Sequence, residues 1–336
     1  MNVIVGMSTP SRAPQTELEK RLRQALGNGT LIIAVLYALL YVVYIITQPA
    51  ALSVSQNTDL LNNALPLAIA AAGGTFVVLT RGFDLSVAGV ISIANVVLAT
   101  DVHNSLAGSL EGLAIVVLIG LLVGAVNGFL VARMGLQSIA STLGTMIICS
   151  GIALLIRDAP GGTVPDFVTD ALTGTITYVL PVAGLIAAIV IIMWLAIKRT
   201  DAGVALYAVG ADETAASLAG IHVVRTKFFA YCTAGVFYGV AGYMLSAQTA
   251  TGNPNAGNPF LLQTFAAIAI GGTSFAGGRG GVIGSMVGAA TLMLLQKVLF
   301  TTGVSSFYTG IFQGAIMIVA VLIAALSARF AHAGRR

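Results

Sequence analysis

The stretch LEGLAIVVLIGLLVGAVNGFLVA at residues 110–132 carries a single charged side chain, that of Glu111, and is otherwise almost wholly apolar. A helix needs about 20 residues of this kind to cross the hydrocarbon core of a bilayer. Three further stretches, at 30–47, 178–197 and 306–327, have a similar length and character. The sequence therefore predicts an all-α fold, a polytopic bundle of transmembrane helices.

The composition of the whole chain agrees with a lipid environment. Of its 336 residues, 57% are hydrophobic and 8% are charged, whereas about 25% are charged in soluble domains. The 39 glycines suit a membrane bundle, because helices in lipid associate through close backbone approach. The net charge of +4 comes from short basic clusters between apolar segments. Such clusters are typical of topology signals, so no nucleic-acid partner is expected.

Ten apolar stretches are expected to be membrane helices. Besides the four above, these are 64–80, 85–101, 138–156, 228–250, 260–276 and 281–299. Two pairs are separated only by short joints, which can be half-helices or re-entrant turns buried in protein. The count is therefore about ten. The joint residues singled out are Arg81, Gly82, Asp84, Gly277, Gly278 and Arg279.

The distribution of basic residues predicts the orientation of the bundle. With the N-terminus in the cytoplasm and ten crossings, all of the 16 lysines and arginines except Arg157 and Lys297 fall on the inner side. Short cytoplasmic loops of membrane proteins carry an excess of lysine and arginine. Both termini are therefore expected in the cytoplasm.

The chain is expected to form one membrane domain with two tails. The tails are residues 1–29 and the basic segment 328–336, and the membrane domain is 30–327 with a long cytoplasmic loop at 198–227. A capping box and a leucine stripe predict that the first tail holds a short amphipathic helix lying on the membrane surface. A solvated, partly disordered tail is the alternative.

Motifs of enzymes are missing from the sequence. It has no GxxxxGK[ST] phosphate-binding loop, no GxSxG nucleophile and no histidines at metal-ligand spacing. No catalytic residue, metal site or cofactor of its own is therefore expected. The acidic residues fall at the edges of the expected spans, whereas ion-coupled transporters carry carboxylates in mid-membrane. A solute path lined by neutral polar groups fits this pattern better.

Neutral polar residues do occur in or beside the expected spans. They can offer hydrogen bonds to a hydroxylated solute. The alternative is hydrogen bonding between helices, worth about 0.6 kcal/mol per pair. The candidate lining residues are Asn95, Asn127, Ser141, Thr142, Thr145, Gln248 and Gln263.

The loop at 198–227 contains the pattern of a short helix. Asp212 can accept hydrogen bonds from the first backbone N–H groups, and Glu213 places a negative charge in the first turn. Gly220 can end the helix in the left-handed conformation. A helix of two turns is unstable alone. It must pack on this chain's own helices or on a soluble partner. The alternative is an interfacial loop with no special role.

A local repeat is also visible. The residues Gly-Gly-Thr at 73–75 and Arg-Gly at 81–82 recur at 271–273 and 279–280 with the same internal spacing. Internal repeats are common in transporters. Chance similarity in a glycine-rich chain is the alternative.

Several motifs follow one another along the chain. They are LTRGFDLSV at 79–87, Asn127-Gly128 with Val131-Ala132, ASTLG at 140–144, YAVGADETAASLAGI at 207–221, IGGTSFAGGRG at 270–280 and GVSSFY at 303–308. Together they resemble the motifs of bacterial ABC-transporter permeases of the ribose/xylose/arabinose type. The chain departs from the pattern of that family at Val87-Ala88-Gly89 and in the acid-free stretch 261–265, so the sugar stays unspecified.

This resemblance implies a function and partners. The chain would be a non-catalytic permease subunit in the inner membrane, translocating a pentose or related monosaccharide. A periplasmic or extracellular binding protein would deliver the sugar, a cytoplasmic ABC ATPase would bind ATP and Mg²⁺, and a second permease chain, identical or paralogous, would complete the path. The helix that couples to the ATPase would comprise Asp212, Glu213, Ala215, Ala216, Leu218, Gly220 and Ile221.

Two other classes of protein remain as alternatives. A stand-alone secondary transporter or channel would need no ATPase, and its uptake should collapse with the ion gradient and be independent of ATP. An intramembrane enzyme is disfavoured by the missing catalytic groups.

Overall fold

The computed structural model describes residues 29–303 except 101, together with 308, 310, 311, 314, 315 and 318. Residues 1–28 of the first expected tail, the whole of the second tail and most of the expected span at 306–327 lie outside the described residues. Statements below concern the described part of the chain.

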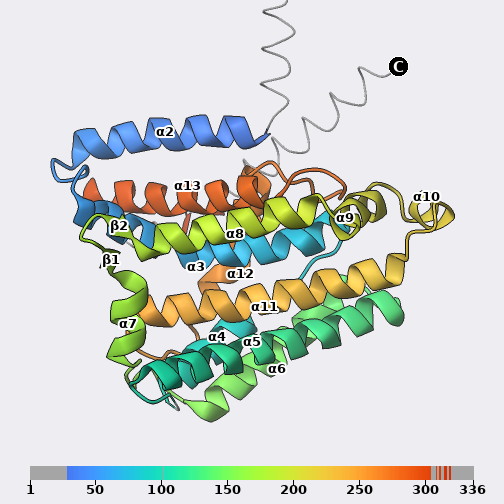
Figure 1. The fold of residues 1–336 in the computed structure, drawn as a ribbon, viewed down its shortest axis with the longest axis horizontal. Coiled ribbons are helices and arrows are strands. Elements are labelled where there is room, and N and C mark those ends of the chain that lie inside the picture. Colours follow the sequence, from blue (N-terminus) through green and yellow to red (C-terminus); the bar gives the residue numbers. More distant parts are fainter. Residues whose placement is uncertain are drawn as a thin grey trace, which may run out of the picture.

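The elements of the described chain are helices apart from one hairpin, in which the two-residue strands β1 and β2 pair antiparallel (Figure 1). The long helices run side by side, with α7 and the hairpin at one end of the bundle and α10 at the other. The elements are α2 (Gly29–Thr47), α3 (Val54–Leu79), α4 (Val87–Leu98), α5 (Leu106–Gly128), the π-helix η1 (Phe129–Arg133), α6 (Ser138–Ile156), α7 (Asp166–Thr173), β1 (Thr175–Ile176), β2 (Leu180–Pro181), α8 (Val182–Lys198), α9 (Asp201–Ala211), α10 (Glu213–Leu218), α11 (Val223–Thr249), α12 (Asn258–Ile270) and α13 (Val282–Thr301).

The bundle has 6 helices in its described part that are long and apolar enough to cross a membrane, or up to 7 if α8 and α9, bent by 76°, form one span. This confirms a polytopic helical bundle. The expected third and eighth spans are shorter than the sequence suggests, because α4 has 12 residues and α12 has 13. At 1.5 Å per residue each reaches only ~20 Å of the roughly 30 Å hydrocarbon core. The count of about ten spans stays a prediction.

Helix α3 starts ten residues before the expected start at 64, and hydrogen bonds of its polar first turns explain why. The hydroxyl of Ser53 caps the helix by accepting from the backbone N–H of Gln56 (3.2 Å). The Tyr44 hydroxyl donates to the Gln56 side chain (3.1 Å). The Tyr41 hydroxyl donates to the Asn57 side chain (2.7 Å). Polar residues that resemble a loop in the sequence are therefore held in a helix by α2.

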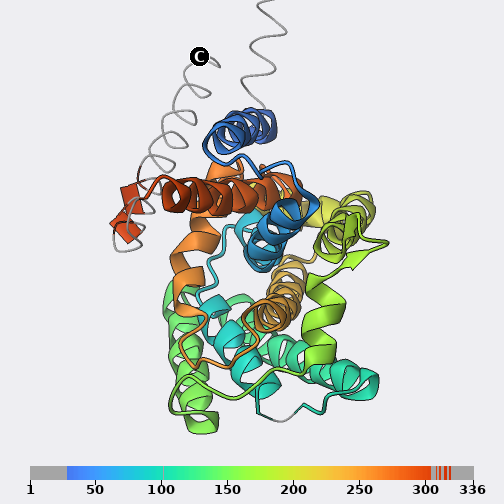
Figure 2. The same ribbon diagram turned by 90° about the vertical axis from the view of Figure 1, so that its left-hand side faces the viewer.

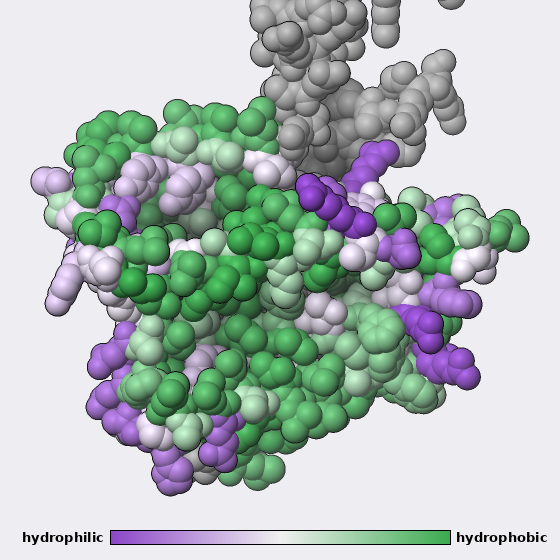
Figure 3. All heavy atoms as spheres, viewed as in Figure 1, coloured by the Kyte–Doolittle hydropathy of each residue, from purple (hydrophilic) through white to green (hydrophobic). Residues whose placement is uncertain are grey.

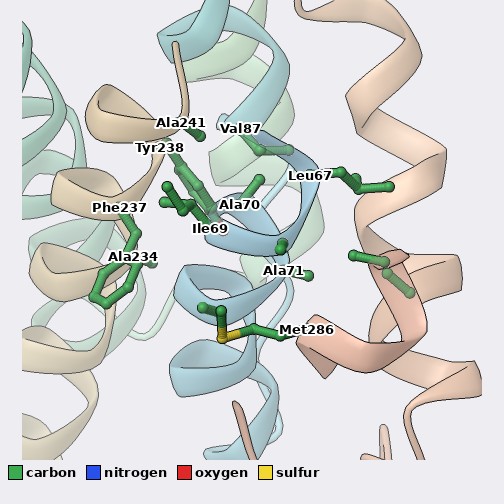
Figure 4. Packing of buried hydrophobic residues seen from close by; sticks show 14 of the residues in the cluster. Leu67, Ile69, Ala70, Ala71, Val87, Ala234, Phe237, Tyr238, Ala241 and Met286 are labelled. Carbon is green, nitrogen blue, oxygen red and sulfur yellow. The ribbon is translucent and has the colours of Figure 1, made fainter. Parts of the chain in front are cut away.

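Helix α3 is the centre of the bundle. In its most apolar window, 83% of the residues are buried, compared with 11% in α2 and 22% in α6. Figure 4 shows Ile69, Ala70 and Ala71 of α3 among side chains of α11 and Met286 of α13. The core is therefore built around one helix, whereas α2 and α6 leave most of their surface exposed in this structure.

Glycines bring α5 and α11 into direct backbone contact. A Cβ atom on Gly120 would overlap the carbonyl oxygen of Gly235, and a Cβ on Gly235 would overlap the carbonyl oxygen of Gly120. One turn further on, a Cβ on Gly239 would overlap the carbonyl oxygen of Val116. In lipid the hydrophobic effect does not drive helices together, so they associate through close packing at small residues such as these. These glycines fix the distance between the two helices.

The surface divides into an apolar middle and two polar ends (Figure 3). Seen from the α7 end, α2 and α13 lie at one edge of the bundle and α5 and α6 at the opposite edge (Figure 2). Large apolar side chains are exposed along the outer helices, among them Leu39, Ile148 and Leu155. A surface of this kind is stable only in contact with lipid or another apolar partner.

Candidate functional site

Helix α10 forms at the place and with the caps that the sequence predicts. The Asp212 carboxylate accepts from the backbone N–H of Ala215 (2.9 Å). At the other end Gly220 has φ +83°. The backbone N–H of Gly220 donates to the carbonyl of Ser217, and that of Ile221 donates to the carbonyl of Ala216, both at 3.0 Å. This pair of backbone hydrogen bonds is the Schellman motif. The capping residues therefore hold six residues in a helix that would not persist alone.

The surface of α10 has one buried and one fully exposed side. Ala216 is buried against the rest of the chain, whereas the side chain of Leu218 is 86% exposed. Ala215 and Gly220 are exposed as well, and Ile221 is half-buried. Figure 1 shows α10 projecting at the end of the bundle. A leucine presented in this way at a helix end is suited to insertion into an apolar groove of another protein.

An ion pair joins α10 to the start of α11. The Glu213 carboxylate lies 2.5 Å from the ammonium group of Lys227, and both side chains are partly exposed. A single pair at such a surface contributes about 1 kcal/mol or less. The pair therefore adds little to the stability of the fold.

Charges of opposite sign gather at the two ends of the bundle. Both ends are hydrophilic (Figure 3). The exposed charged residues at the α10 end are mostly basic, and those at the α7 end are mostly acidic. The exposed basic residues at the first end include Arg133, Lys198, Arg199, Arg225 and Arg279, and the exposed acids at the second are Asp59, Glu111, Asp158, Asp166 and Asp170.

The first predicted joint, between α3 and α4, is buried and closed by hydrogen bonds. Asp84 is 2% exposed, and its Oδ1 accepts from the backbone N–H (3.0 Å) and hydroxyl (2.6 Å) of Ser86. The Asn127 amide also donates to Oδ1 (3.4 Å). The backbone N–H of Leu85 donates to the Thr142 hydroxyl (3.1 Å). Irregular backbone at membrane depth requires internal partners of this kind.

Three predicted lining residues therefore meet at this joint. Thr145 donates to the Asn127 side-chain oxygen (2.8 Å), and Asn127 also donates to the Ser86 hydroxyl (3.0 Å). Thr142 and Thr145 come from α6, and Asn127 comes from α5. Their polar groups are engaged within the chain. Ser86 was not singled out from the sequence, although serine directly after a joint aspartate is a local signal for a turn.

The other predicted lining residues are dispersed. Asn95 donates to the Ser246 hydroxyl (2.9 Å) and accepts from the backbone N–H of Asn253 (2.6 Å), so it fastens α4 to α11 and the segment that follows. Gln248 is half-buried at the α7 end, and its amide donates to Asn63 (2.5 Å). Gln263 is 9% exposed in α12. Ser141 is half-buried in α6, bonded to its own helix. Together the seven do not form one cluster.

The second predicted joint, between α12 and α13, lies against the first. Gly277 and Gly278 both have positive φ, +78° and +67°. Both pack against the end of α9, and Gly277 also packs against Arg81 of the first joint. The two copies of the sequence repeat differ in local structure, since 73–75 lie inside α3 whereas 271–273 follow the end of α12. Their threonines nevertheless meet: the Thr75 and Thr273 hydroxyls lie 2.7 Å and 3.3 Å from that of Ser285.

Comparison with known protein families gives one match that covers most of the chain. Residues 56–321 match the family described as branched-chain amino acid transport system / permease component. No solved structure matches the chain.

Comparison with individual proteins gives relatives of similar length. The chain is 32% identical to the ribose import permease protein RbsC of Haemophilus influenzae, over 82% of this chain and 86% of that protein. It is 31% identical to RbsC of Bacillus subtilis, over 85% and 89% of the two chains. It is 30% identical to the galactose/methyl galactoside import permease protein MglC of H. influenzae, over 92% and 97%.

Proposed function

This chain belongs to the family of branched-chain amino acid transport system permease components, and we propose that it is the membrane-spanning subunit of an ATP-binding-cassette importer for a monosaccharide. The observation that carries the proposal is its similarity, over more than 80% of its length, to permeases named for ribose and for galactose or methyl galactoside. The family description names amino acids, but these relatives extend over nearly the whole chain and are named for sugars. A sugar is therefore the favoured cargo.

In this proposal α10 docks on a cytoplasmic ATPase subunit, which binds ATP and Mg²⁺. The exposed Leu218 and the firm capping of α10 support this role. The basic α10 end would face the cytoplasm, in agreement with the preference of positive charge for the inner side of a membrane. Both termini would lie on that side as well, and this chain would contribute no catalytic step.

The α7 end would then face outward and receive the sugar from a binding protein. Its exposed carboxylates would interact with basic side chains on that protein, and such contacts speed encounter. The dispersed neutral groups of the inner bundle, with Gln248 nearest this end, remain the candidates for contact with sugar hydroxyls. A second permease chain, identical or paralogous, would supply the other wall of the path. The rocking of such helices between two arrangements is the expected mode of transport.

The proposal is tested by reconstitution into liposomes. The chain, assembled with its ATPase and binding protein, is expected to accumulate radiolabelled ribose or galactose only when ATP is present on the ATPase side. Collapsing the ion gradients with ionophores is expected to leave uptake unchanged. Accumulation against a gradient by this chain alone would show instead that it is a secondary transporter.

The ion pair of α10 provides a charge-swap prediction within this function. Glu213→Lys places two ammonium groups together, and we expect the initial uptake rate to fall about two- to fivefold, the range set by a surface pair. The double variant Glu213→Lys, Lys227→Glu restores opposite charges and is expected to recover most of the rate. Equal impairment of the single and double variants would mean that the pair does not orient α10.

A further inference from the structure

The side chain of Arg81 links three segments that are far apart in the sequence. Its Nε donates to the carbonyl oxygens of Gly210 (2.7 Å) and Ala276 (2.8 Å), and an Nη donates to that of Ala211 (2.5 Å). Arg81 itself follows the end of α3. Gly210 and Ala211 end α9, and Ala276 belongs to the joint between α12 and α13. One guanidinium therefore binds the carbonyl groups of two other segments, and such charge-assisted bonds are the strong ones.

The backbones of the three segments also touch. The backbone N–H of Gly278 donates to the carbonyl of Leu79, the last residue of α3 (3.0 Å). A Cβ on Gly210 would overlap that same carbonyl oxygen and lie 2.5 Å from the nitrogen of Gly278. No side chain or lipid separates the segments here. A displacement of one segment must therefore move the others.

The backbone of Arg81 is in a conformation that arginine rarely adopts. Its φ is +63°, in the left-handed region where glycine is usual. Such a conformation persists only where surrounding contacts impose it, and it is found mainly at functional positions. The left-handed turn ends α3 and places the guanidinium between the two carbonyl groups of α9.

No linker residue separates this contact from α10. Ala211, whose carbonyl accepts from Arg81, is followed by Asp212, and Asp212 is the N-cap of α10. On the other side, α3 is fastened to the 271–281 segment a second time, through the Thr75 and Ser285 hydroxyls. A path of direct contacts therefore runs from α10 through Arg81 to the central helix.

We propose that Arg81 is the positioning residue that transmits movement of α10 to α3 and to the joint between α12 and α13. The inference rests on the proposed function, because α10 moves only when an ATPase docked on it changes conformation. It also makes a statement about this chain alone: without the Arg81 guanidinium, α10 and the joint lose their fixed relative position.

Arg279 offers a matched control. It occupies the position of the sequence repeat that corresponds to Arg81, lies at the same end of the bundle and is exposed. Within the described residues its side chain makes no hydrogen bond and no ion pair. Arg279→Ala removes the same charge from the same end and leaves the three-segment contact in place.

The first experiment measures coupling in the assembled transporter in liposomes. We expect Arg81→Ala to lower the number of sugar molecules imported per ATP hydrolysed by about tenfold, the effect of losing charge-assisted hydrogen bonds. Arg81→Lys, which keeps the charge but not the forked donors, is expected to lie between Arg81→Ala and the parent. Arg279→Ala is expected to stay within about twofold of the parent. An unchanged ratio in Arg81→Ala, or an equal loss in Arg279→Ala, would overturn the proposal.

The second experiment needs no ATPase and no transport. Spin labels are placed at Leu218→Cys and Ala276→Cys of the full chain in nanodiscs, with Cys149 and Cys232 replaced by alanine. The distance distribution is expected to be narrow in the parent and in Arg279→Ala, and broadened in Arg81→Ala and to a smaller extent in Arg81→Lys. Equal widths in all four would overturn the positioning role. If the chain binds no ATPase but the widths differ as stated, the importer proposal fails and the role of Arg81 stands.

Discussion

Replacing Leu218 with aspartate is expected to abolish binding of this chain to its ATPase subunit without changing the fold. The leucine side chain is 86% exposed, and burying it in a partner's groove contributes about 1.5–3 kcal/mol. A carboxylate buried there without a partner costs several kilocalories more. The dissociation constant should therefore rise by more than about a hundredfold. The measurement is binding of the purified ATPase to the chain in nanodiscs.

A second variant distinguishes a loss of docking contacts from damage to α10 itself as the cause of lost binding. Leu218→Met keeps the volume and apolar character, so binding should stay within about tenfold of the parent. The midpoint of thermal unfolding should be the same for the parent, Leu218→Asp and Leu218→Met, since the side chain at 218 makes few contacts within the chain. Full binding by Leu218→Asp would mean that α10 is not the element that docks.

The substitution Gly120→Val is expected to prevent α5 and α11 from packing and to lower the yield of folded protein severely. The added Cβ would overlap the carbonyl oxygen of Gly235, and backbone atoms cannot move aside as a flexible side chain can. Overpacking of a core usually costs about 1–3 kcal/mol, and a contact to backbone should be at the upper end. The measurement is the midpoint of thermal inactivation in detergent, followed by size-exclusion chromatography.

Gly144→Val is the matched control for that experiment. Gly144 also lies within an apolar helix, α6, but a Cβ there meets no atom within 4 Å. The same change of residue should leave the midpoint of the isolated chain unaltered. Similar losses in both variants would show that valine at a helical glycine, and not the α5–α11 contact, causes the effect.

The features predicted well from the sequence are those with local causes. Long apolar runs locate α2, α5, α6 and α11, because lipid requires length and apolar character. The caps of α10 are local too, since Asp212 and Gly220 act on backbone groups a few residues away. Local chemistry therefore sufficed for the helical bundle and for the short helix in the loop at 198–227.

Features that depend on distant contacts could not be predicted. The early start of α3 depends on the tyrosines of α2, and the left-handed turn at Arg81 depends on carbonyl groups of α9 and of the second joint. The polar residues proposed to line a path were chosen for their chemistry, but the sequence does not reveal which side of a helix they occupy. Asn127 and Thr145 bond to each other inside the bundle. A role in the path stays a prediction for these residues.

The central position of α3 has a consequence for biosynthesis. This helix lies in the first quarter of the chain, yet α8, α11, α12 and α13, which bury it, begin at Val182 or later. While the ribosome completes them, the nascent α3 must wait in or near the insertion machinery, because Asn62 and Thr75 still lack their later partners, Thr173 and Ser285. Polar groups left in hydrocarbon are unfavourable, so premature release into lipid would be resisted until the second half of the polypeptide arrives. Stop codons placed after α6 should therefore yield fragments that quality-control proteases remove.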